Sequence, residues 1–309
     1  MGSLLPTHEQ ADALLRQLGF DEADRLDVLA AMPSPERQPT LWELLEHAYQ
    51  RVRGEVGKID AGYVSWPPFP PELVEHERYF WIFVYLAAVP DIRRWHVERG
   101  VPEDISWATL ADLGRHVRLY RRRNGRLGLD TGFWIALHFR GALYALGRLQ
   151  FNPYRLLTGP AGPAFWYDPE DTRPGPRSGD SVLGVHIPES GPMDPVSCNR
   201  SFAAAAEFFP RLFPEYASRI ATCTSWLLDD QLLEYLPADS NIVRFQKRFK
   251  LVPGARDSDD SIFHFVFGKP VAAAGDIEPR TTLERAILKH LEDGRHWRMR
   301  TGWLELSAE

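Results

Sequence analysis

The sequence SVLGVHIPESGPMDPVSCNRSFAAAAEFF, residues 181–209, decides the fold of the second half of the chain. Residues 181–187 are rich in apolar and β-branched side chains, which is typical of a buried strand, and Pro188 ends it. Asp194 followed by Pro195 predicts a helix start, because Asp caps the first N–H groups and proline suits the first helical position. The segment therefore predicts a strand, a short loop and a helix that continues through the alanine run.

The chain beyond residue 209 changes between strand and helix patterns. Alternating apolar and polar residues predict a hairpin from residues 241–252 and 261–267. Thr281 and Glu284 form a capping-box pattern at the start of a last helix, which Gly294 ends. The other elements expected here are a strand at 219–227 and a short helix at 229–235.

The first part of the chain shows apolar residues at helical spacing, and the proline cluster WPPFPP at 66–71 interrupts this pattern. The run YFWIFVYLAAVP, residues 79–90, is about 12 residues long, whereas a membrane span needs ~20. It predicts a buried helix that Pro90 stops. A further helix is expected at 131–146, and the strands expected before residue 181 lie at 146–154 and 164–167.

These patterns predict an α+β protein of two domains. An all-helical N-terminal domain covers residues 1–130, and a mixed sheet flanked by helices covers residues 131–309. A chain of 309 residues is long enough for two such cores.

Composition excludes several classes of function. The net charge is −6, from 36 basic and 42 acidic residues, whereas nucleic-acid-binding domains usually carry a basic excess. The two cysteines, Cys198 and Cys223, do not form a disulfide framework. The first residues show no signal-peptide pattern. We therefore expect a cytoplasmic protein with reduced thiols that binds neither nucleic acid nor membrane.

The strand–loop–helix segment is also the best candidate for a binding site. A helix N-terminus presents unpaired N–H groups and partial positive charge, so the start of the helix at Asp194 predicts a phosphate site. The strand at 219–227 should lie beside the strand at 181–187. If the two strands separate, an extended ligand fits between them, and the short helix at 229–235 brings Tyr235 near the opening.

Four stretches have a familiar pattern: ISWATLADLGRHV (105–117), DTGFWIALHFRGALYALGRLQF (130–151), VHIPESGPMDP (185–195) and TCTSWLLDDQLLEYLPADSNIVRFQKRF (222–249). With the order of elements, they resemble bacterial acyltransferases that join a helical N-acyltransferase N-terminal domain to a C-terminal domain like that of the GCN5-related N-acetyltransferases (GNAT). The resemblance implies a GNAT-like mixed sheet in the second domain.

The resemblance also implies a reaction, in which an acyl group passes from acyl-CoA, such as acetyl-CoA, or a related pantetheine thioester to an amine. The acceptor is a small molecule or a peptide, an acyl carrier protein is an alternative donor, and no metal takes part. By the same resemblance, Tyr235 protonates the leaving thiolate. The residues implied in holding the donor are Ile187, Glu189, Ser190, Gly191, Met193, Asp194 and Ser197.

The phosphate loop departs from the family pattern. It lacks a leading Gln or Arg and a second small residue, and Pro192 removes one N–H donor. Glu189 and Asp194 add negative charge where a phosphate should bind. Either arginine side chains from elsewhere hold the phosphate, or a carrier arm presents the acyl group, or the chain is a non-catalytic acyl-CoA-binding protein on a degenerate GNAT scaffold.

His186 is the candidate general base, because an unperturbed imidazole titrates near neutral pH. Strand alternation places it on the face opposite Val185 and Ile187, and the alternative is a hydrogen-bonded core histidine. Cys223 and Ser225 share one face of their strand, and a hydrolase that uses Cys223 with His186 is a third hypothesis. The candidate substrate-binding residues are Cys223, Ser225, Asp239, Asn241 and Arg244. The alternative for the last three is turn and hairpin capping. Histidines at 96, 116 and 138 lack metal-ligand spacing.

Overall fold

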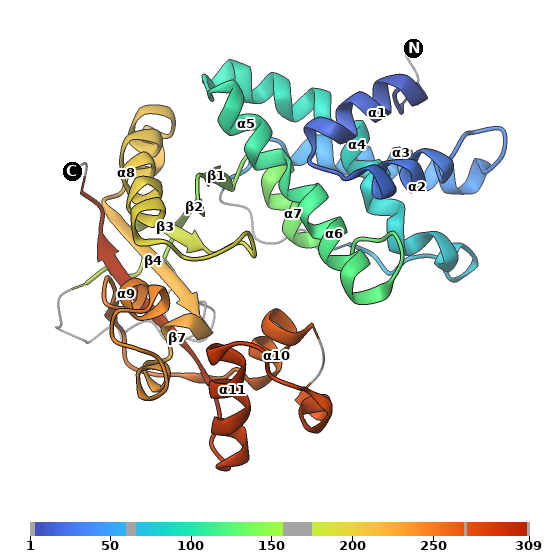
Figure 1. Ribbon diagram of the computed structural model, residues 1–309. Coiled ribbons are helices and arrows are strands. Elements are labelled where there is room, and N and C mark those ends of the chain that lie inside the picture. The colour runs from blue at the N-terminus through green and yellow to red at the C-terminus, as the bar shows by residue number, and fades with distance from the viewer. Residues whose placement is uncertain (1–3, 60–65, 157–174, 269–270, 308–309) are drawn as a thin grey trace. The chain divides into compact units, whose positions relative to one another are not determined.

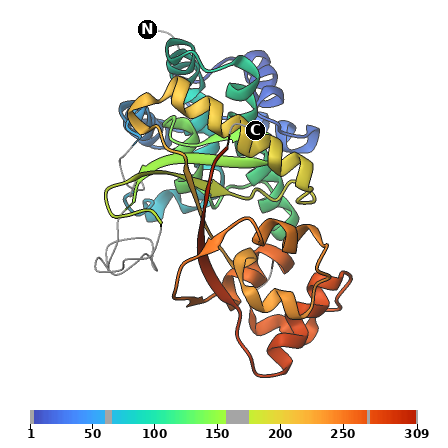
Figure 2. The ribbon, with the colours of Figure 1, turned by 90° about the vertical axis from the view of Figure 1, so that its left-hand side faces the viewer.

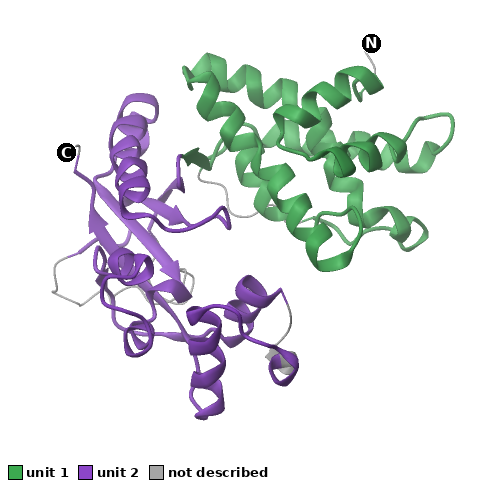
Figure 3. Cartoon of the chain, in the orientation of Figure 1, with its two compact units in different colours: residues 1–146 green, residues 147–309 purple. Residues whose placement is uncertain are grey.

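The computed structural model describes residues 4–59, 66–156, 175–268 and 271–307. The chain forms two compact units, residues 1–146 and 147–309 (Figure 3). The sequence predicted a change of domain after residue 130. In the structure, unit 1 extends to residue 146, because the helix at 132–139 buries Ile135 and Phe139 in the core of unit 1.

Unit 1 is helical, as the sequence predicted, and its elements follow one another around α4 (Figure 1). Their bounds are α1 (His8–Gln17), α2 (Glu22–Ala30), α3 (Pro39–Glu55), η1 (Pro71–Leu73), α4 (Val74–Arg99), α5 (Glu103–Leu110), α6 (Asp112–Asn124), α7 (Gly132–Phe139) and the short strand β1 (Tyr144–Leu146).

Helix α4 is the central element of unit 1, and every residue from Ile82 to Val89 is buried. The expectation that Pro90 stops this helix is wrong, since α4 continues to Arg99 and ends at Gly100 with φ 77°. Pro90 is exposed, so its ring projects toward solvent, and the helix continues past it with one N–H donor fewer. Within the described ranges, no helix is both long and apolar enough to cross a membrane.

Unit 2 contains a mixed sheet with flanking helices, which confirms the predicted fold class. Its elements are β2 (Leu149–Arg155), β3 (Ser181–His186), α8 (Pro195–Leu212), η2 (Pro214–Tyr216), β4 (Ile220–Ser225), η3 (Trp226–Leu228), η4 (Asp230–Glu234), α9 (Asn241–Gln246), β5 (Lys250–Leu251), β6 (Arg256–Asp257), α10 (Asp259–Phe267), η5 (Val271–Asp276), α11 (Thr282–Glu292) and β7 (Arg298–Glu305).

The strand order in unit 2 is β2-β3-β4-β7-β5, and β6 pairs with β7. Strands β3 and β4 are parallel, whereas β2 with β3 and β4 with β7 are antiparallel. Helix α8 packs on one face, where Ser201 Oγ accepts a 3.2 Å hydrogen bond from Leu149 N and the Phe202 ring meets Phe151. Helix α9 packs beside α8, whereas α10 and α11 lie together near the start of β7 (Figure 2).

The predicted hairpin at 241–252 and 261–267 is wrong. Residues 241–246 form α9, whose N-cap Ser240 accepts a hydrogen bond from Val243 N, and residues 259–267 form α10, which ends at Gly268 with φ 63°. Both segments bury adjacent residues, whereas a hairpin with one exposed face buries every second residue. The sequence also missed strand β7, and the strand expected at 164–167 lies outside the described residues.

A buried histidine makes the stability of unit 1 depend on pH. His96 is fully buried, and its Nδ1 lies 2.7 Å from Ser106 Oγ. Burial lowers the pKa of His96 to about 3. Below pH 6.5 the His96 imidazole binds a proton in the unfolded chain but not in the folded chain. The stability present at higher pH is therefore lost as the pH falls.

We predict that the free energy of unfolding decreases by about 1 kcal/mol between pH 7 and pH 5.5 through His96 alone. Urea unfolding of the wild type and of His96→Gln at both pH values measures this effect. The variant is less stable at pH 7 but should lose about 1 kcal/mol less on acidification. Parallel pH profiles for the two proteins would contradict the assignment.

Candidate active site

Strands β3 and β4 separate soon after they meet. Only two residue pairs join them, Leu183 with Ala221 and Gly184 with Thr222. In contrast, β3 pairs with β2 through all six of its residues, and β4 pairs with β7 through all six. The two halves of the sheet therefore diverge between β3 and β4, and Figure 2 shows the light-green β2 crossing the red β7 at a steep angle. This is the separation that the sequence analysis made a condition for an extended ligand.

His186 ends β3 on the side where the strands diverge, and a neighbouring side chain orients its ring. The Nε2 atom of His186 lies 2.6 Å from Asn152 Oδ1 on β2. Because that oxygen can only accept, Nε2 carries the proton and Nδ1 is the basic nitrogen. Asn152 reaches His186 by crossing Gly184, where a Cβ would come within 2.2 Å of Asn152 Oδ1. The glycine therefore makes room for the contact that fixes His186.

The face of the sheet that carries His186 bears a row of hydrogen-bonding side chains near that residue. By register and alternation, Gly184 and His186 share this face with Thr222 and Thr224. The Tyr154 hydroxyl lies 2.7 Å from Thr222 Oγ1, and the Thr224 and Thr301 hydroxyls lie 2.9 Å apart. Hydrogen-bonding groups thus continue from β2 to β7 across the divergence. The prediction that His186 faces away from Val185 and Ile187 agrees with this register.

Cys223 lies on the opposite face of the sheet, and Cys198 lies on helix α8. Cys223 is 2% exposed, and burial raises the pKa of its thiol to about 12. Alternation places Cys223 with Ala221 on the face away from His186, so the two cannot work as a nucleophile and base. The hydrolase hypothesis is therefore wrong. Cys198 in the first turn of α8 is also buried, which raises the pKa of its thiol.

The loop between β3 and α8 is held from one side by Arg148. Its guanidinium donates to the carbonyl oxygens of Pro188 at 3.1 Å, Gly191 at 2.8 Å and Pro192 at 2.9 Å. A trans peptide directs its C=O and the next N–H to opposite sides. The N–H groups of Glu189 and Met193 therefore point away from Arg148. Gly191 has φ 101°, which only glycine adopts without strain.

The N-terminus of α8 is occupied by the protein's own carboxylate. Asp194 Oδ2 accepts hydrogen bonds from Ser197 N at 2.8 Å and from Ser197 Oγ at 2.9 Å, and these bonds lower the pKa of Asp194. Cys198 N donates to Asp194 O at 2.9 Å. The first N–H groups of the helix are thus already paired, whereas the sequence predicted a phosphate site at this helix start.

Basic side chains surround this helix start. Arg248, which follows α9, donates to Pro195 O at 3.3 Å and to Asn199 Oδ1, and its guanidinium lies 5.8 Å from the centre of the Phe202 ring. The charge of Arg200 contributes to the lowered pKa of Asp194. Arg200 and Arg248 are therefore basic side chains outside the loop, of the kind that one alternative required, whereas Arg148 is paired with the loop carbonyls. Sequence reasoning missed Arg148 and Arg248 because nothing in their local pattern distinguishes them from surface arginines.

Tyr235 follows η4, and its contacts lie on and beyond α11. The hydroxyl is 3.0 Å from His290 Nδ1, and the ring packs beside Trp297. His290 Nε2 lies 3.3 Å from His296 O, so Nε2 carries the ring proton and Nδ1 accepts from Tyr235. In this arrangement the Tyr235 proton points at His290.

The remaining candidates are spread over three elements. Ser225 is the N-cap of η3, and its Oγ accepts from Leu227 N at 3.1 Å. Asn241 and Arg244 belong to α9, and Asp239 precedes it with an exposed side chain. The alternative for Asp239, Asn241 and Arg244 was that they cap a turn and a hairpin, and the structure has the helix α9 in place of that hairpin. In the described part of the chain, no group of three or more His, Cys, Asp or Glu side chains could hold a metal ion.

Comparison with known proteins identifies both halves of the chain. The model of the GNAT-like C-terminal domain matches residues 143–304, and the model of the N-acyltransferase N-terminal domain matches residues 9–141. No curated protein matches the chain.

Solved structures resemble the whole chain. An acyltransferase in complex with decanoyl-CoA and teicoplanin is 40% identical, with a TM-score of 0.86 over 98% of this chain and 90% of that one. An acyltransferase with CoA and 10C-teicoplanin is 39% identical, with a TM-score of 0.86 and the same coverage. A mutant acyltransferase with octanoyl-CoA is 39% identical, with a TM-score of 0.85 and again the same coverage.

We predict that Gly184→Ala displaces Asn152 and destabilises the fold by about 1–3 kcal/mol, as overpacking of a filled site usually does. Urea unfolding measures the cost, and NMR of the His186 ring reports whether the Nε2–H tautomer persists. Combining the change with Asn152→Ala removes the closest contact, so the two costs should not add. Additive costs and an unchanged His186 ring would contradict the proposed role of Gly184.

Proposed function

Because the chain belongs to the family of acyltransferases that join an N-acyltransferase N-terminal domain to a GNAT-like C-terminal domain, we propose that it acylates an amine of a small-molecule or peptide acceptor. It is an acyl-CoA-dependent acyltransferase. The observation that carries the proposal is the divergence of β3 and β4 beside an oriented histidine.

We place the donor thioester between β3 and β4, where the backbone groups beyond Gly184 and Thr222 do not pair with each other. An N–H of the segment after His186 would then polarise the thioester carbonyl as charge develops on its oxygen. The Met193 N–H, which points away from Arg148, and the Arg248 guanidinium would hold the pyrophosphate. In this proposal the first N–H groups of α8 do not bind the pyrophosphate, which agrees with their pairing to Asp194.

The reaction is an attack of the acceptor nitrogen on the thioester carbonyl carbon. A C–N bond forms, the C–S bond breaks, and the electron pair leaves with the sulfur of CoA. His186 Nδ1 takes the proton that the acceptor nitrogen loses. The Asn152 contact holds the ring proton on Nε2 and so keeps Nδ1 basic. The thiolate must gain a proton, for which Tyr235 remains the predicted donor. That role requires its hydroxyl to turn from His290.

The molecules bound in similar solved structures suggest the chemical class of the donor and of the acceptor. The similar acyltransferases hold decanoyl-CoA and octanoyl-CoA, and one holds teicoplanin together with its donor. We propose that this chain uses acyl chains of comparable length and an acceptor of the teicoplanin class. An acyl carrier protein remains an alternative donor, and a cytoplasmic location remains an expectation.

We predict that the protein transfers the decanoyl group from decanoyl-CoA to teicoplanin or to another amine in a panel, and that His186→Gln lowers kcat by ~10²–10⁴-fold. Mass spectrometry of the acceptor and thiol release give the rate. His264→Gln, which changes an exposed histidine of α10, is the matched control. Binding of decanoyl-CoA without turnover on any amine would favour the non-catalytic alternative.

A separate test concerns Tyr235. If Tyr235 protonates the thiolate, Tyr235→Phe should reduce kcat at least ~10²-fold while the affinity for decanoyl-CoA stays unchanged. Stopped-flow turnover and calorimetric binding, measured side by side, separate the two quantities. Unchanged turnover would remove Tyr235 from the mechanism and leave its hydroxyl a structural partner of His290.

A further inference from the structure

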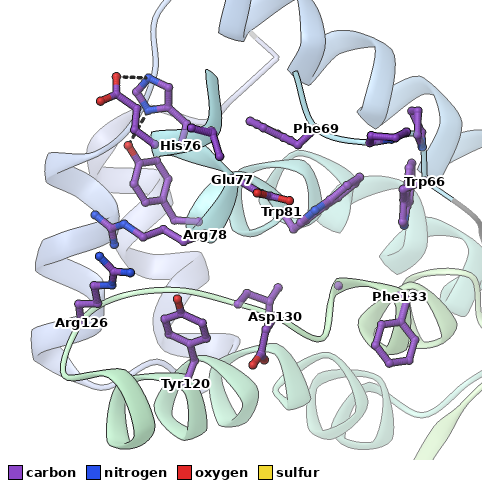
Figure 4. Close-up of a pocket in the computed structure, with 17 residues that line it drawn as sticks. Trp66, Phe69, His76, Glu77, Arg78, Trp81, Tyr120, Arg126, Asp130 and Phe133 are labelled. Atoms are coloured by element: carbon purple, nitrogen blue, oxygen red, sulfur yellow. Dashed lines mark hydrogen bonds and ion pairs between the residues drawn. The ribbon is translucent and has the colours of Figure 1, made fainter. Parts of the chain in front are cut away.

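Unit 1 contains a cavity of about 940 Å³ that the reaction above does not use. The proline segment at 66–71, the first turns of α4 and the residues from Tyr120 to Phe133 form its wall (Figure 4). The stiff WPPF sequence gives one side a fixed shape, because proline restricts its own backbone and that of the preceding residue. All lining residues belong to unit 1.

Aromatic rings form much of the wall, and glycines hold two of them in place. Trp66 and Trp81 pack together with ring centres 4.2 Å apart. A Cβ at Gly132 would come within 3.1 Å of Trp81 Cγ, and one at Gly128 would come within 2.2 Å of the Tyr120 ring. The rings of Trp81 and Tyr120 thus lie directly on backbone. Phe133 is 49% exposed at the cavity, so about half of this apolar side chain remains accessible.

Two carboxylates lie among these rings without a partner. Figure 4 shows Glu77 beside Trp81, and Asp130 between Tyr120 and Phe133. Within the described part of the chain, neither carboxylate forms a hydrogen bond or an ion pair. A carboxylate beside an aromatic face favours a cation, since both attract positive charge.

The basic residues of the wall are set apart from this region. Arg78 donates to Leu127 O at 2.5 Å and lies 4.7 Å from the centre of the Tyr79 ring, so its guanidinium is already engaged. Figure 4 shows Arg126 next to Arg78, away from Glu77 and Phe133. Ionisable groups along the wall also make it a poor site for an alkyl chain, which would have to displace their water.

We propose that this cavity recognises the acceptor, by binding a protonated amine carried on a ring. The ring stacks on Phe133 and the indoles, and the ammonium group lies between Glu77 and Asp130. This inference rests on the proposed function for the identity of the ligand as an acceptor.

The test uses benzylamine, a cation at neutral pH, and benzyl alcohol, which has the same ring without charge. Saturation-transfer NMR and calorimetry on the full chain should show benzylamine binding at least ~5-fold more tightly. Glu77→Gln and Phe133→Ala should each weaken benzylamine binding ~5-fold or more. Their matched controls, Glu98→Gln on the same helix and Phe265→Ala on α10, change exposed residues outside the cavity and should bind like the wild type.

Equal affinity for the amine and the alcohol, or an unchanged affinity in Glu77→Gln, would overturn the proposal. Circular dichroism of each variant identifies any that fails to fold, and Glu77→Gln alters an exposed side chain that the fold does not use. The binding readout needs no acyl donor. If amine binding is seen but decanoyl transfer is not, the proposed function and the identity of the amine as an acceptor fail, while the amine site itself stands. Decanoyl transfer without amine binding in the cavity overturns this site and leaves the proposed function in place.

Discussion

The short pairing between β3 and β4 is the constraint on which the site in unit 2 depends. Two parallel pairs join these strands, and each strand is otherwise committed to its antiparallel neighbour. A continuous ladder would bury the backbone groups that a thioester can use, whereas complete separation would divide the sheet. The pairing that remains leaves the backbone groups of β3 and β4 beyond Gly184 and Thr222 unpaired with each other, while each strand stays paired to its outer neighbour.

The side chains around the opening follow from the same register. Gly184 lies at the last β3–β4 pair, and its missing side chain lets Asn152 reach His186 from the neighbouring strand. Helix α8 covers the face that carries Phe151, while the face that carries His186 also carries the hydroxyls of Tyr154 and Thr222. Arg148 supports the following loop from one side and so directs some of its N–H groups to the other.

Much of this arrangement could be predicted from the sequence, and the failures have physical reasons. The strand, loop and helix around Asp194 have strong local signals, and the structure reproduces them. The segment at 241–252 fits both a strand and a helix period, and the Ser240 cap decides for the helix. Strand β7 and the arginines near α8 depend on contacts between distant parts of the chain, which no local pattern encodes. The N-terminus of α8 does bind a negatively charged group, but that group is the carboxylate of its own Asp194.

The account depends most on the location of the donor, which a crystal structure of the protein with decanoyl-CoA measures directly. We predict that the thioester lies between β3 and β4 on the His186 side, with the pyrophosphate near Met193 N and Arg248. A donor bound elsewhere, with β3 and β4 closed against each other or with His186 turned from the thioester carbon, would contradict the account.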